Sequence, residues 1–552
     1  MLIRSLLALM IVSVSWSCSK NDQPAPNPGL FGYVETRIGN TTASTNLVNI
    51  PVNPVIKVKL SAPVNRATAA GFVELKEYGF GPSNAQISFE NNDSTLVIQP
   101  AANLKHITRY IVYLSPELSS VANVKLGNPI NILFMTAIDS TDKFPQIPDD
   151  QLLNLVQRQT FTYFWEFGHP VSGMARERNT SGDLVTTGGT GFGIMGIPVA
   201  VTRNFITRAE GLERVNKIVD FLSNSCTRYH GAFAHWLNGA TGSTIPFSPN
   251  DNGGDLVETS FLMAGLLTAR QFFDGADAAE TSLRNKINLL YDAVEWNWYR
   301  KNNEDVLYWH WSPTVGWAMN MQVKGWNEAL IVYILAASSR THPIPASVYH
   351  NGWASNGGMQ NNNSYYGYTL PLGPSRGGPL FFAHYSFLGI NPNGLSDQYA
   401  NYSQQLRNHS LINHEYCKAN PRNYFGYSEK CWGLTASDIP NNGYTASEPN
   451  NDVGVIAPTA AISSMPYTPA ESMAALKFFY YTLGDKLWGP HGFYDAFSLK
   501  DAWFASSTLA IDQGPIVVMI ENYRSGLVWN LLTSSPDIKD GMRLLGFSAP
   551  YL

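Results

Sequence analysis

The sequence predicts two folded parts: a small all-β, immunoglobulin-like sandwich, and an all-α domain shaped as an (α/α)6 toroid, a double ring of six inner and six outer helices. Three observations predict this arrangement. Residues 30–138 hold short runs that alternate apolar and polar side chains, separated by Asn, Gly and Pro. From 150 to 552, apolar residues recur instead at helical spacing. The length of 552 residues also exceeds the usual size of one domain.

Residues 1–18 have the composition of an export signal. Arg4 supplies the positive charge, Leu6 to Val14 form an apolar stretch too short to span a bilayer, and small residues precede Cys18. The end of this segment, SWSC, resembles a bacterial lipobox, although it lacks the usual Leu and contains a bulky Trp. We therefore expect Cys18 to be lipidated and the protein to be an outer-membrane lipoprotein of the periplasm or cell surface. An ordinary cleaved signal peptide is the alternative.

A tether, a module and a linker follow in order. Residues 19–29 are polar and Pro-rich, as in a flexible tether. In the module, 30–138, the segment 56–60 alternates Ile, Val and Leu with lysines, and the run NPINILFMTA resembles the closing strand of bacterial Ig-like modules. Such a module is more often a spacer than a sugar binder. Residues 139–150 form a linker with prolines and acidic residues, and the helical domain begins there.

Amphipathic or buried helical runs fill the second part of the chain. Long loops rich in Gly, Asn and Pro join them, so we expect the loops to carry the functional site. An α-solenoid is the alternative architecture, although no fixed repeat is apparent. The predicted helices cover residues 151–167, 208–224, 257–273, 281–299, 327–339, 397–416, 466–483 and 514–533.

Composition excludes several classes of function. Lys plus Arg (37) nearly balances Asp plus Glu (42) and no basic run occurs, which argues against a nucleic-acid partner. No C-x-x-C pair and no H-E-x-x-H motif is present, so neither a metal nor a cofactor is expected. Cys417 and Cys431 could close a small disulfide loop in an oxidising compartment, which would leave Cys226 free and buried. Aromatic residues reach 12%, and their rings suit apolar cores and sugar faces equally well.

Acidic residues gather at the predicted helix starts. In PNDNGGDLVETSFLMAGLL, Asp251, Asp255 and Glu258 precede a long apolar helix. A capping box, with Asp255 as the cap and Glu258 as its partner, explains two of them equally well. A second acid, Glu328, stands at the head of another buried helix, in MQVKGWNEALIVYILAAS. The same placement recurs for three further acids, Glu448, Asp452 and Asp512.

In a helical ring, the N-termini of the inner helices meet at one mouth, so these carboxyl groups are expected to converge. Shared burial and mutual repulsion would raise the pKa of at least one of them, as a general acid near neutral pH requires. Cleavage of a glycosidic bond typically needs two such carboxyl groups. The acids therefore indicate a glycoside hydrolase whose partner is a polysaccharide or oligosaccharide.

Two polar or aromatic segments supply candidates for substrate contact. SGDLVTTGGTGFGIMG is predicted to be a loop with hydroxyls and accessible backbone N–H groups, and it lacks the phosphate-loop pattern G-x-x-x-x-G-K-S/T. YWHWSPTVGW clusters aromatic rings, most of which we expect in the core and one or two as stacking platforms. The predicted substrate-binding residues are Asp183, Thr187, Trp311, Trp326 and Glu448.

Seven segments, in order, resemble the glucoamylase-like group classed as glycoside hydrolase family 144: TTGGTGFGIMG, GGDLVETSFLMAGLL, KGWNEALIVYILAASS, YFGYSEKCWGLTASDIP, GVIAPTAAISSMPYTPAESMAAL, LWGPHGFYDAF and IDQGPIVVMIENYRSGLVW. The resemblance runs from about 150 to 540. It implies an (α/α)6 toroid that cuts β-1,2-glucan with anomeric inversion, either as an endo-glucanase or by releasing sophorose from chain ends. It also implies that Asp251, Asp255, Glu258 and Glu328 form the acidic cluster required for activity. As a hypothesis, Glu328 is the general acid, and Asp255 or Asp452 is the base that acts through a water.

Other functions stay open on the sequence alone. The same toroid could hydrolyse another glucan linkage, because the acids would be identical and only the loops would differ. A surface glycan-binding lipoprotein without catalysis is less consistent with so many acids at helix heads, because binding neutral sugars needs no clustered charge. A polysaccharide lyase normally needs a basic cleft, which the near-balanced charge disfavours. Endo and exo action are both compatible with the sequence.

Overall fold

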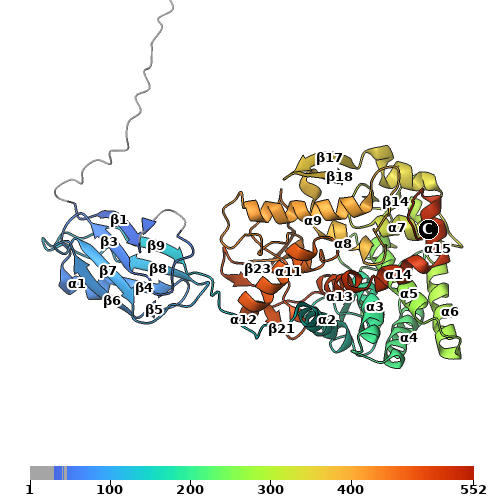
Figure 1. Ribbon diagram of the computed structural model, residues 1–552, viewed down its shortest axis with the longest axis horizontal. Coiled ribbons are helices and arrows are strands. Elements are labelled where there is room, and N and C mark those ends of the chain that lie inside the picture. Colours follow the sequence, from blue (N-terminus) through green and yellow to red (C-terminus); the bar gives the residue numbers. More distant parts are fainter. Residues whose placement is uncertain (1–29, 40, 43–46) are drawn as a thin grey trace, which may run out of the picture. The chain divides into compact units, whose positions relative to one another are not determined.

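The computed structural model describes residues 30–39, 41–42 and 47–552. The predicted export segment, Cys18 and the tether at 19–29 lie outside the described residues. The chain divides into two compact units, Met1–Ile138 and Asp139–Leu552 (Figure 1). Within the described ranges, no helix combines the length and apolar character needed to cross a bilayer.

The first unit contains two antiparallel sheets, with strand orders β2-β1-β3-β7-β6 and β5-β4-β8-β9. Alternation explains the packing, because Ile56, Val58 and Leu60 of β3 are buried while Lys57 and Lys59 point outward. A single core of aliphatic and aromatic side chains joins the sheets, as in an Ig-like sandwich. The elements are β1 Tyr33–Ile38, β2 Thr41–Thr42, β3 Ile56–Leu60, α1 Arg66–Phe72, β4 Val73–Glu77, β5 Pro82–Ser83, β6 Ala85–Glu90, β7 Thr95–Pro100, β8 Arg109–Leu114 and β9 Ile130–Met135.

The second unit is built from helices joined by long loops, with short antiparallel hairpins among the loops (Figure 1). Its helices are α2 Asp149–Trp165, α3 Thr187–Thr202, α4 Arg208–Asn224, α5 Leu256–Phe272, α6 Ala278–Asp292, α7 Leu330–Ser338, α8 Phe381–His384, α9 Tyr402–Ala419, α10 Pro458–Ile462, α11 Pro469–Lys477, α12 Gly484–Leu487, α13 Ala510–Arg524, α14 Leu527–Ser534 and α15 Pro536–Leu544. The short strands nearest the site are β10 Leu184–Thr186, β11 Trp236–Asn238, β12 Thr244–Ile245, β13 Gly254–Asp255, β15 His310–Trp311, β19 Ala436–Ile439 and β20 Gly443–Ala446.

The prediction of a loop at the glycine-rich segment was wrong, because Thr187–Thr202 is the buried helix α3. Glycine lowers helix propensity, but here it permits close packing. A Cβ on Gly191 would collide with the Phe261 carbonyl of α5, and one on Gly265 would collide with the Gly191 carbonyl. The two helices therefore cross with their backbones in contact, which brings the starts of α3 and α5 together.

Two predicted helices end earlier than expected. The run at 281–299 ends as a helix at Asp292, and only a short 3-10 turn, Trp298–Arg300, follows. The run at 514–533 is two helices, α13 and α14, separated at Gly526, which adopts φ +71°. Apolar periodicity continues across both breaks, so it could not reveal them.

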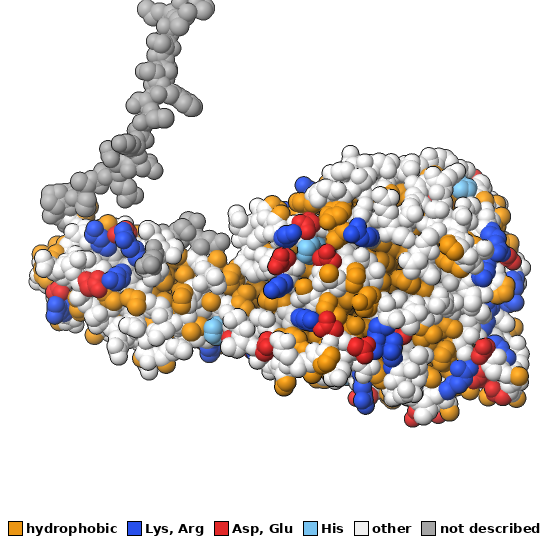
Figure 2. All heavy atoms as spheres, in the orientation of Figure 1, with side chains coloured by type: hydrophobic (Ala, Val, Ile, Leu, Met, Phe, Trp, Pro, Cys, Tyr) orange, Lys and Arg blue, Asp and Glu red, His pale blue; other side chains and the backbone are white. Residues whose placement is uncertain are grey.

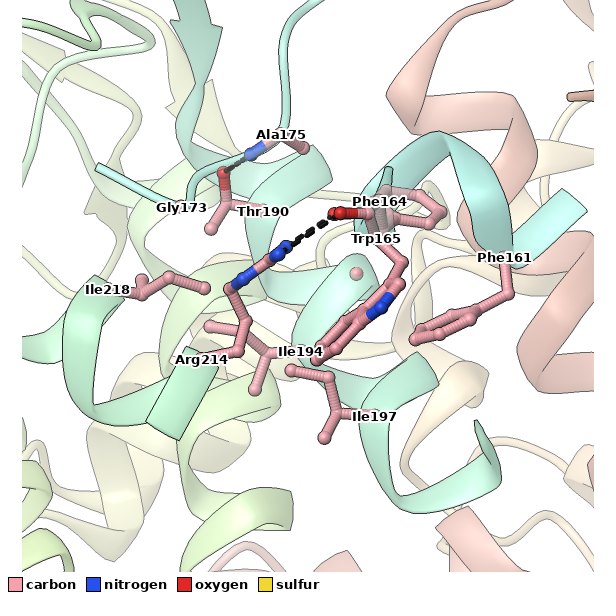
Figure 3. Close-up of a pocket in the computed structure, with 11 residues that line it drawn as sticks. Phe161, Phe164, Trp165, Gly173, Ala175, Thr190, Ile194, Ile197, Arg214 and Ile218 are labelled. Carbon is pink, nitrogen blue, oxygen red and sulfur yellow. Dashed lines mark hydrogen bonds between the residues drawn. The ribbon is translucent and has the colours of Figure 1, made fainter. Parts of the chain in front are cut away.

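A small pocket between α2, α3 and α4 shows how the end of α2 is held (Figure 3). The guanidinium of Arg214 on α4 lies 4.3 Å from the Trp165 ring centroid and donates hydrogen bonds to the carbonyls of Phe164 (3.0 Å) and Trp165 (3.0 Å). These carbonyls end α2 and lack intrahelical partners. Arg214 therefore caps the C-terminus of α2 from a neighbouring helix.

The sequence allowed a disulfide between Cys417 and Cys431, but in the structure both are free, buried thiols. Burial raises the pKa of both thiols, which disfavours the reactive thiolate. Cys226 is also free, and it is only partly buried.

Buried histidines make the stability of the second unit depend on pH. His409 of α9 is fully buried and donates from Nε2 to the Gly378 carbonyl (3.0 Å), and burial lowers its pKa to about 4. His384 lies nearby, and burial lowers its pKa to about 3. As the pH falls below 6.5, the ordinary pKa of histidine, these two rings take up protons in the unfolded chain but not in the folded chain.

Between pH 6.5 and 4, each of the two histidines should lower the free energy of unfolding by up to about 1.4 kcal/mol per pH unit, whereas the buried carboxyl groups whose pKa is raised act in the opposite sense. Melting curves across this range compare the slope of the wild type with that of His409→Gln, which should lose less stability, or gain more, as the pH falls. The matched control is His342→Gln, at a partly exposed position, which should leave the slope unchanged. Equal slopes in all three proteins would contradict this account.

Candidate active site

Asp255 and Glu258 lie at the start of α5, as predicted, but they form only half of a capping box. The Asp255 carboxylate accepts a hydrogen bond from the Glu258 backbone N–H (2.9 Å), so Asp255 is the N-cap. The Glu258 carboxylate does not return to Asp255. It accepts from the Gly188 N–H (2.7 Å) in the first turn of α3. Helix capping therefore explains the position of the Asp255 side chain, but it does not explain why the Glu258 side chain points toward α3.

Glu328 precedes α7 and faces the same region. Its backbone carbonyl accepts a hydrogen bond from the Ser386 hydroxyl, which fixes the segment. Burial, together with the negative charges of Glu258 and Asp255, raises the pKa of Glu328 to about 7. Glu258 and Glu328 line the same cavity, and Asp255 caps the helix that carries Glu258, so acids from two different helix heads converge here.

Two of these three carboxyl groups border a cavity of about 490 Å³, and Asp255 is fully buried beside Glu258. Glu258 and Glu328 both line it, from α5 and from the residues before α7. Aromatic side chains form about half of the remaining wall, and the hairpin β19–β20 contributes Tyr444. The cavity residues are Glu177, Arg178, Thr186, His235, Trp236, Phe247, Glu258, Phe261, Trp309, Glu328, Phe381, Tyr385, Ala436, Tyr444, Ala446, Leu509 and Ile511.

Asp251 is buried just behind this wall. Its carboxylate lies 3.5 Å from His310 Nε2. Burial raises the pKa of Asp251 to about 7, and the neighbouring charge of Asp255 adds to the effect. Asp251 therefore belongs to the acidic cluster without lining the cavity.

The buried acids differ in their charge state. Burial alone would raise the pKa of Asp255, but the hydrogen bond from His235, the nearby His310 and the Glu258 N–H hold it below its ordinary value. Burial raises the pKa of Glu258, and the charge of Asp255 reinforces this while His235 opposes it. One carboxylate is thus kept ionised beside others that retain protons, the division that acid–base catalysis needs.

His235 was missed by the sequence analysis. Its Nδ1 lies 3.1 Å from Asp255 Oδ2, and its ring lines the cavity. No motif spacing links this lone histidine, in AFAHW, to the acids about twenty residues later. The pairing arises because the segment before β11 runs between the starts of α3 and α5, where Thr187 N–H donates to the His235 carbonyl (3.1 Å) and Asp255 N–H donates to the Phe233 carbonyl (2.8 Å).

His235, Asp251 and Asp255 also have the composition of a metal site, with one ligand atom from each within 4.8 Å of the others. The direct His235–Asp255 hydrogen bond nevertheless satisfies this pair without an ion, because a protonated imidazole already balances one of the carboxylates.

The structure does not place Asp452 at the cavity. Its carboxylate accepts hydrogen bonds from the hydroxyls of Tyr427 (2.8 Å) and Tyr416 (3.0 Å) and from the Gly454 N–H (2.8 Å). The next helix, α10, begins only at Pro458, so Asp452 is in a loop and not at a helix head. These bonds give it a role in holding that loop.

Of the predicted substrate-binding residues, Asp183 and Thr187 lie on either side of β10. Asp183 is exposed and pairs with His169 (3.2 Å). Thr187 is fully buried, and its hydroxyl donates to the Ala234 carbonyl (2.5 Å). Thr187 therefore supports the segment that carries His235 and does not reach the cavity.

The other three predicted contacts also lie away from the cavity wall. Trp311 packs edge-to-face on Trp298, with ring centroids 5.2 Å apart. Trp326 is buried against Phe387 and Tyr402. The carboxylate of Glu448 accepts from the backbone N–H of Asn450 (3.0 Å). The aromatic rings that line the cavity instead include Trp236, Phe247, Trp309 and Tyr444.

A second carboxyl pair lies deeper in the same unit. Asp495 and Asp512 are buried and interact with each other, and burial raises the pKa of Asp495 to about 7 and that of Asp512 well above its ordinary value. The Asp438 N–H donates to Asp495 (2.7 Å), and Asp438 pairs with Arg178 (3.1 Å), which lines the cavity. Asp512 stands in the first turn of α13, as the sequence predicted.

Comparisons with known proteins agree with this geometry. A family model described as "Putative glucoamylase" matches residues 320–536, and one for a bacterial Ig-like domain matches 34–138. An endo-β-1,2-glucanase from Chitinophaga pinensis, solved with sophorotriose and glucose, is 51% identical, with a TM-score of 0.72; the match covers 74% of this chain and 100% of that one. The chain belongs to glycoside hydrolase family 144.

Two relatives from Parabacteroides distasonis extend the comparison within family 144. A solved β-1,2-glucanase is 37% identical with a TM-score of 0.71, over 91% of this chain and 74% of that one. An exo-β-1,2-glucooligosaccharide sophorohydrolase acting at the non-reducing end is 46% identical over 418 residues, which are 72% of this chain. The match spans 58% of the length of that curated relative.

Proposed function

We propose that this member of family 144 hydrolyses β-1,2-glucan. The observation that carries the proposal is the pair of carboxyl groups, Glu258 and Glu328, that line one aromatic cavity from different helix heads. The choice of the β-1,2 linkage rests on the activities for which the Chitinophaga pinensis and Parabacteroides distasonis relatives are named. On the displayed face of the second unit, charges of both signs lie in small groups (Figure 2). The cavity wall holds three glutamates and one arginine, unlike the basic cleft of a lyase.

In the proposed mechanism, Glu328 is the general acid that protonates the departing glycosidic oxygen. A carboxyl group with a pKa of about 7 keeps its proton in about half of the molecules in neutral solution, and this form can donate. Asp255, held ionised by His235, acts as the base through a water on the opposite face of the sugar, and this single displacement inverts the anomeric carbon. Asp452 is the weaker candidate for the base, because its carboxylate contacts Tyr427, Tyr416 and Gly454, none of which lines the cavity, whereas Asp255 contacts His235, which does.

Incubation with linear β-1,2-glucan tests the proposal. We expect new reducing ends from this polymer and none from β-1,3-glucan or starch. A ladder of products at early times would identify endo action, and sophorose from the outset would identify exo action. Binding without new reducing ends on any glucan would refute the hydrolase.

We further propose the arrangement of the whole chain. Residues 150–552 form the catalytic domain as a ring of six inner and six outer helices, and the Ig-like module at 30–138 acts as a spacer. A lipid on Cys18 anchors the protein at the outer membrane, and contact with the membrane is confined to this anchor. Labelling with a fatty-acid analogue, lost in Cys18→Ala, tests the anchor.

A further inference from the structure

The His235 ring is held in one orientation from two sides. Its Nδ1 lies 3.1 Å from the Asp255 carboxylate, which is fully buried. The Phe247 ring stacks on the imidazole with centroids 4.3 Å apart and an angle of 29° between the planes. Stacking on an aromatic face stabilises a cationic ring more than a neutral one. Both contacts therefore favour the imidazolium.

The ionisable side chains that face His235 are the acids Asp251, Asp255 and Glu258. His310 lies 3.5 Å from Asp251 and 3.7 Å from Asp255, and burial lowers its pKa. An ionised carboxylate that is buried without a partner is costly, and a cation on His235 offsets that cost for Asp255. The carboxylates raise the pKa of His235 to about 9, against the effect of burial. His235 thus supplies the positive charge of this cluster at neutral pH.

The second nitrogen of the ring is free for another partner. With Nδ1 directed to Asp255, Nε2 makes no hydrogen bond to any described residue, although the ring lines the cavity. On a protonated imidazole this nitrogen is a donor. Sugar hydroxyls accept such bonds, and the adjacent Phe247 and Trp236 rings suit the apolar face of a pyranose.

We propose that His235 both positions Asp255 and binds substrate: Nδ1–H holds the Asp255 carboxylate, and Nε2–H donates to a glucosyl hydroxyl in the cavity. The proposal rests on the proposed function, because it names a further residue of the same site. It makes the neutral form of His235 inactive, so activity should fall in alkaline solution as the ring loses its proton.

The first experiment needs no catalysis. In protein labelled with ¹⁵N-histidine, the His235 resonance, assigned by its loss in His235→Asn, should report an imidazolium that titrates at about 9. Asp251→Asn and Asp255→Asn should each move this titration toward 6.5, since each removes a facing carboxylate. Titration of wild-type His235 near 6.5, or no movement in either variant, would overturn the proposal.

The second experiment separates the two nitrogens. The amide of His235→Asn can replace Nδ1 and that of His235→Gln can replace Nε2. We expect the Asn variant to raise KM about 10-fold, through loss of one substrate hydrogen bond, and the Gln variant to lower kcat about 100-fold, through loss of the Asp255 contact. His230→Asn is the matched control, because His230 also pairs with a carboxylate (Glu295, 3.0 Å) and stacks on an aromatic ring (Trp298), yet it does not line the cavity.

Equal effects of the two variants on KM and kcat, with unchanged pH profiles, would indicate a merely structural histidine and overturn the proposal. If wild-type protein cleaves no β-1,2-glucan, the proposed function fails by itself, and the resonance titration still decides whether His235 holds Asp255. The two failures are therefore distinguishable.

Discussion

Replacing Glu328 with Gln should lower kcat on β-1,2-glucan by about 10³-fold, because the amide cannot protonate the leaving oxygen. The substitution keeps the size of the side chain and removes a group that burial holds protonated up to a pH of about 7. The alkaline limb of the wild-type pH profile that belongs to Glu328 should disappear with it. Initial rates of reducing-end release between pH 4 and 9 measure both effects.

Two controls distinguish acid catalysis from loss of fold. Glu471→Gln changes an acid in the first turn of α11, away from the cavity, and should keep full activity. A sophorosyl fluoride should remain a substrate of Glu328→Gln, because fluoride leaves without protonation. Turnover of the glucan by Glu328→Gln near the wild-type rate would remove Glu328 from the mechanism.

The acids could be predicted because their signal is local. A carboxyl residue just before an apolar run indicates a helix start, and the inner helices of a ring begin on the same side. This reasoning located Asp255, Glu258 and Glu328, and the structure brings them together. The same reasoning failed for Asp452, because the loop that holds this residue continues to Pro458, where α10 begins. The Asp452 carboxylate accepts hydrogen bonds from two tyrosine hydroxyls instead.

The missed features depend on contacts between distant segments. Helix α3 carries several glycines, which individually disfavour a helix, and only close packing against its neighbours explains them. Gly188 and Gly191 face α5, Gly189 faces Ala510 of α13, and Gly193 faces Phe164 of α2. Likewise, His235 is held by a hydrogen bond to Asp255 and by stacking on Phe247, and no sequence motif predicts either contact. The fold class and the acidic cluster could therefore be predicted from local sequence patterns, whereas the residues of the cavity wall could not.

The second large effect is expected at Asp255. Asp255→Asn should lower kcat by about 10²- to 10³-fold, since the amide cannot accept the proton of the attacking water. The start of α5 should survive, because Asn caps a helix as well as Asp does and its oxygen can still accept from the Glu258 N–H.

The matched control is Asp277→Asn, at the N-cap of α6, where the side chain accepts from the N–H groups of Ala279 and Glu280. Both variants remove one charge at a helix start, so any shared loss of stability belongs to capping. Only Asp255 also contacts His235, which lines the cavity, so only Asp255→Asn should lose activity, and any loss of stability beyond that of Asp277→Asn reports the lost contact with His235. Equal activities of the two variants would show that Asp255 serves only as a cap, and the base would then have to be sought elsewhere in the acidic cluster.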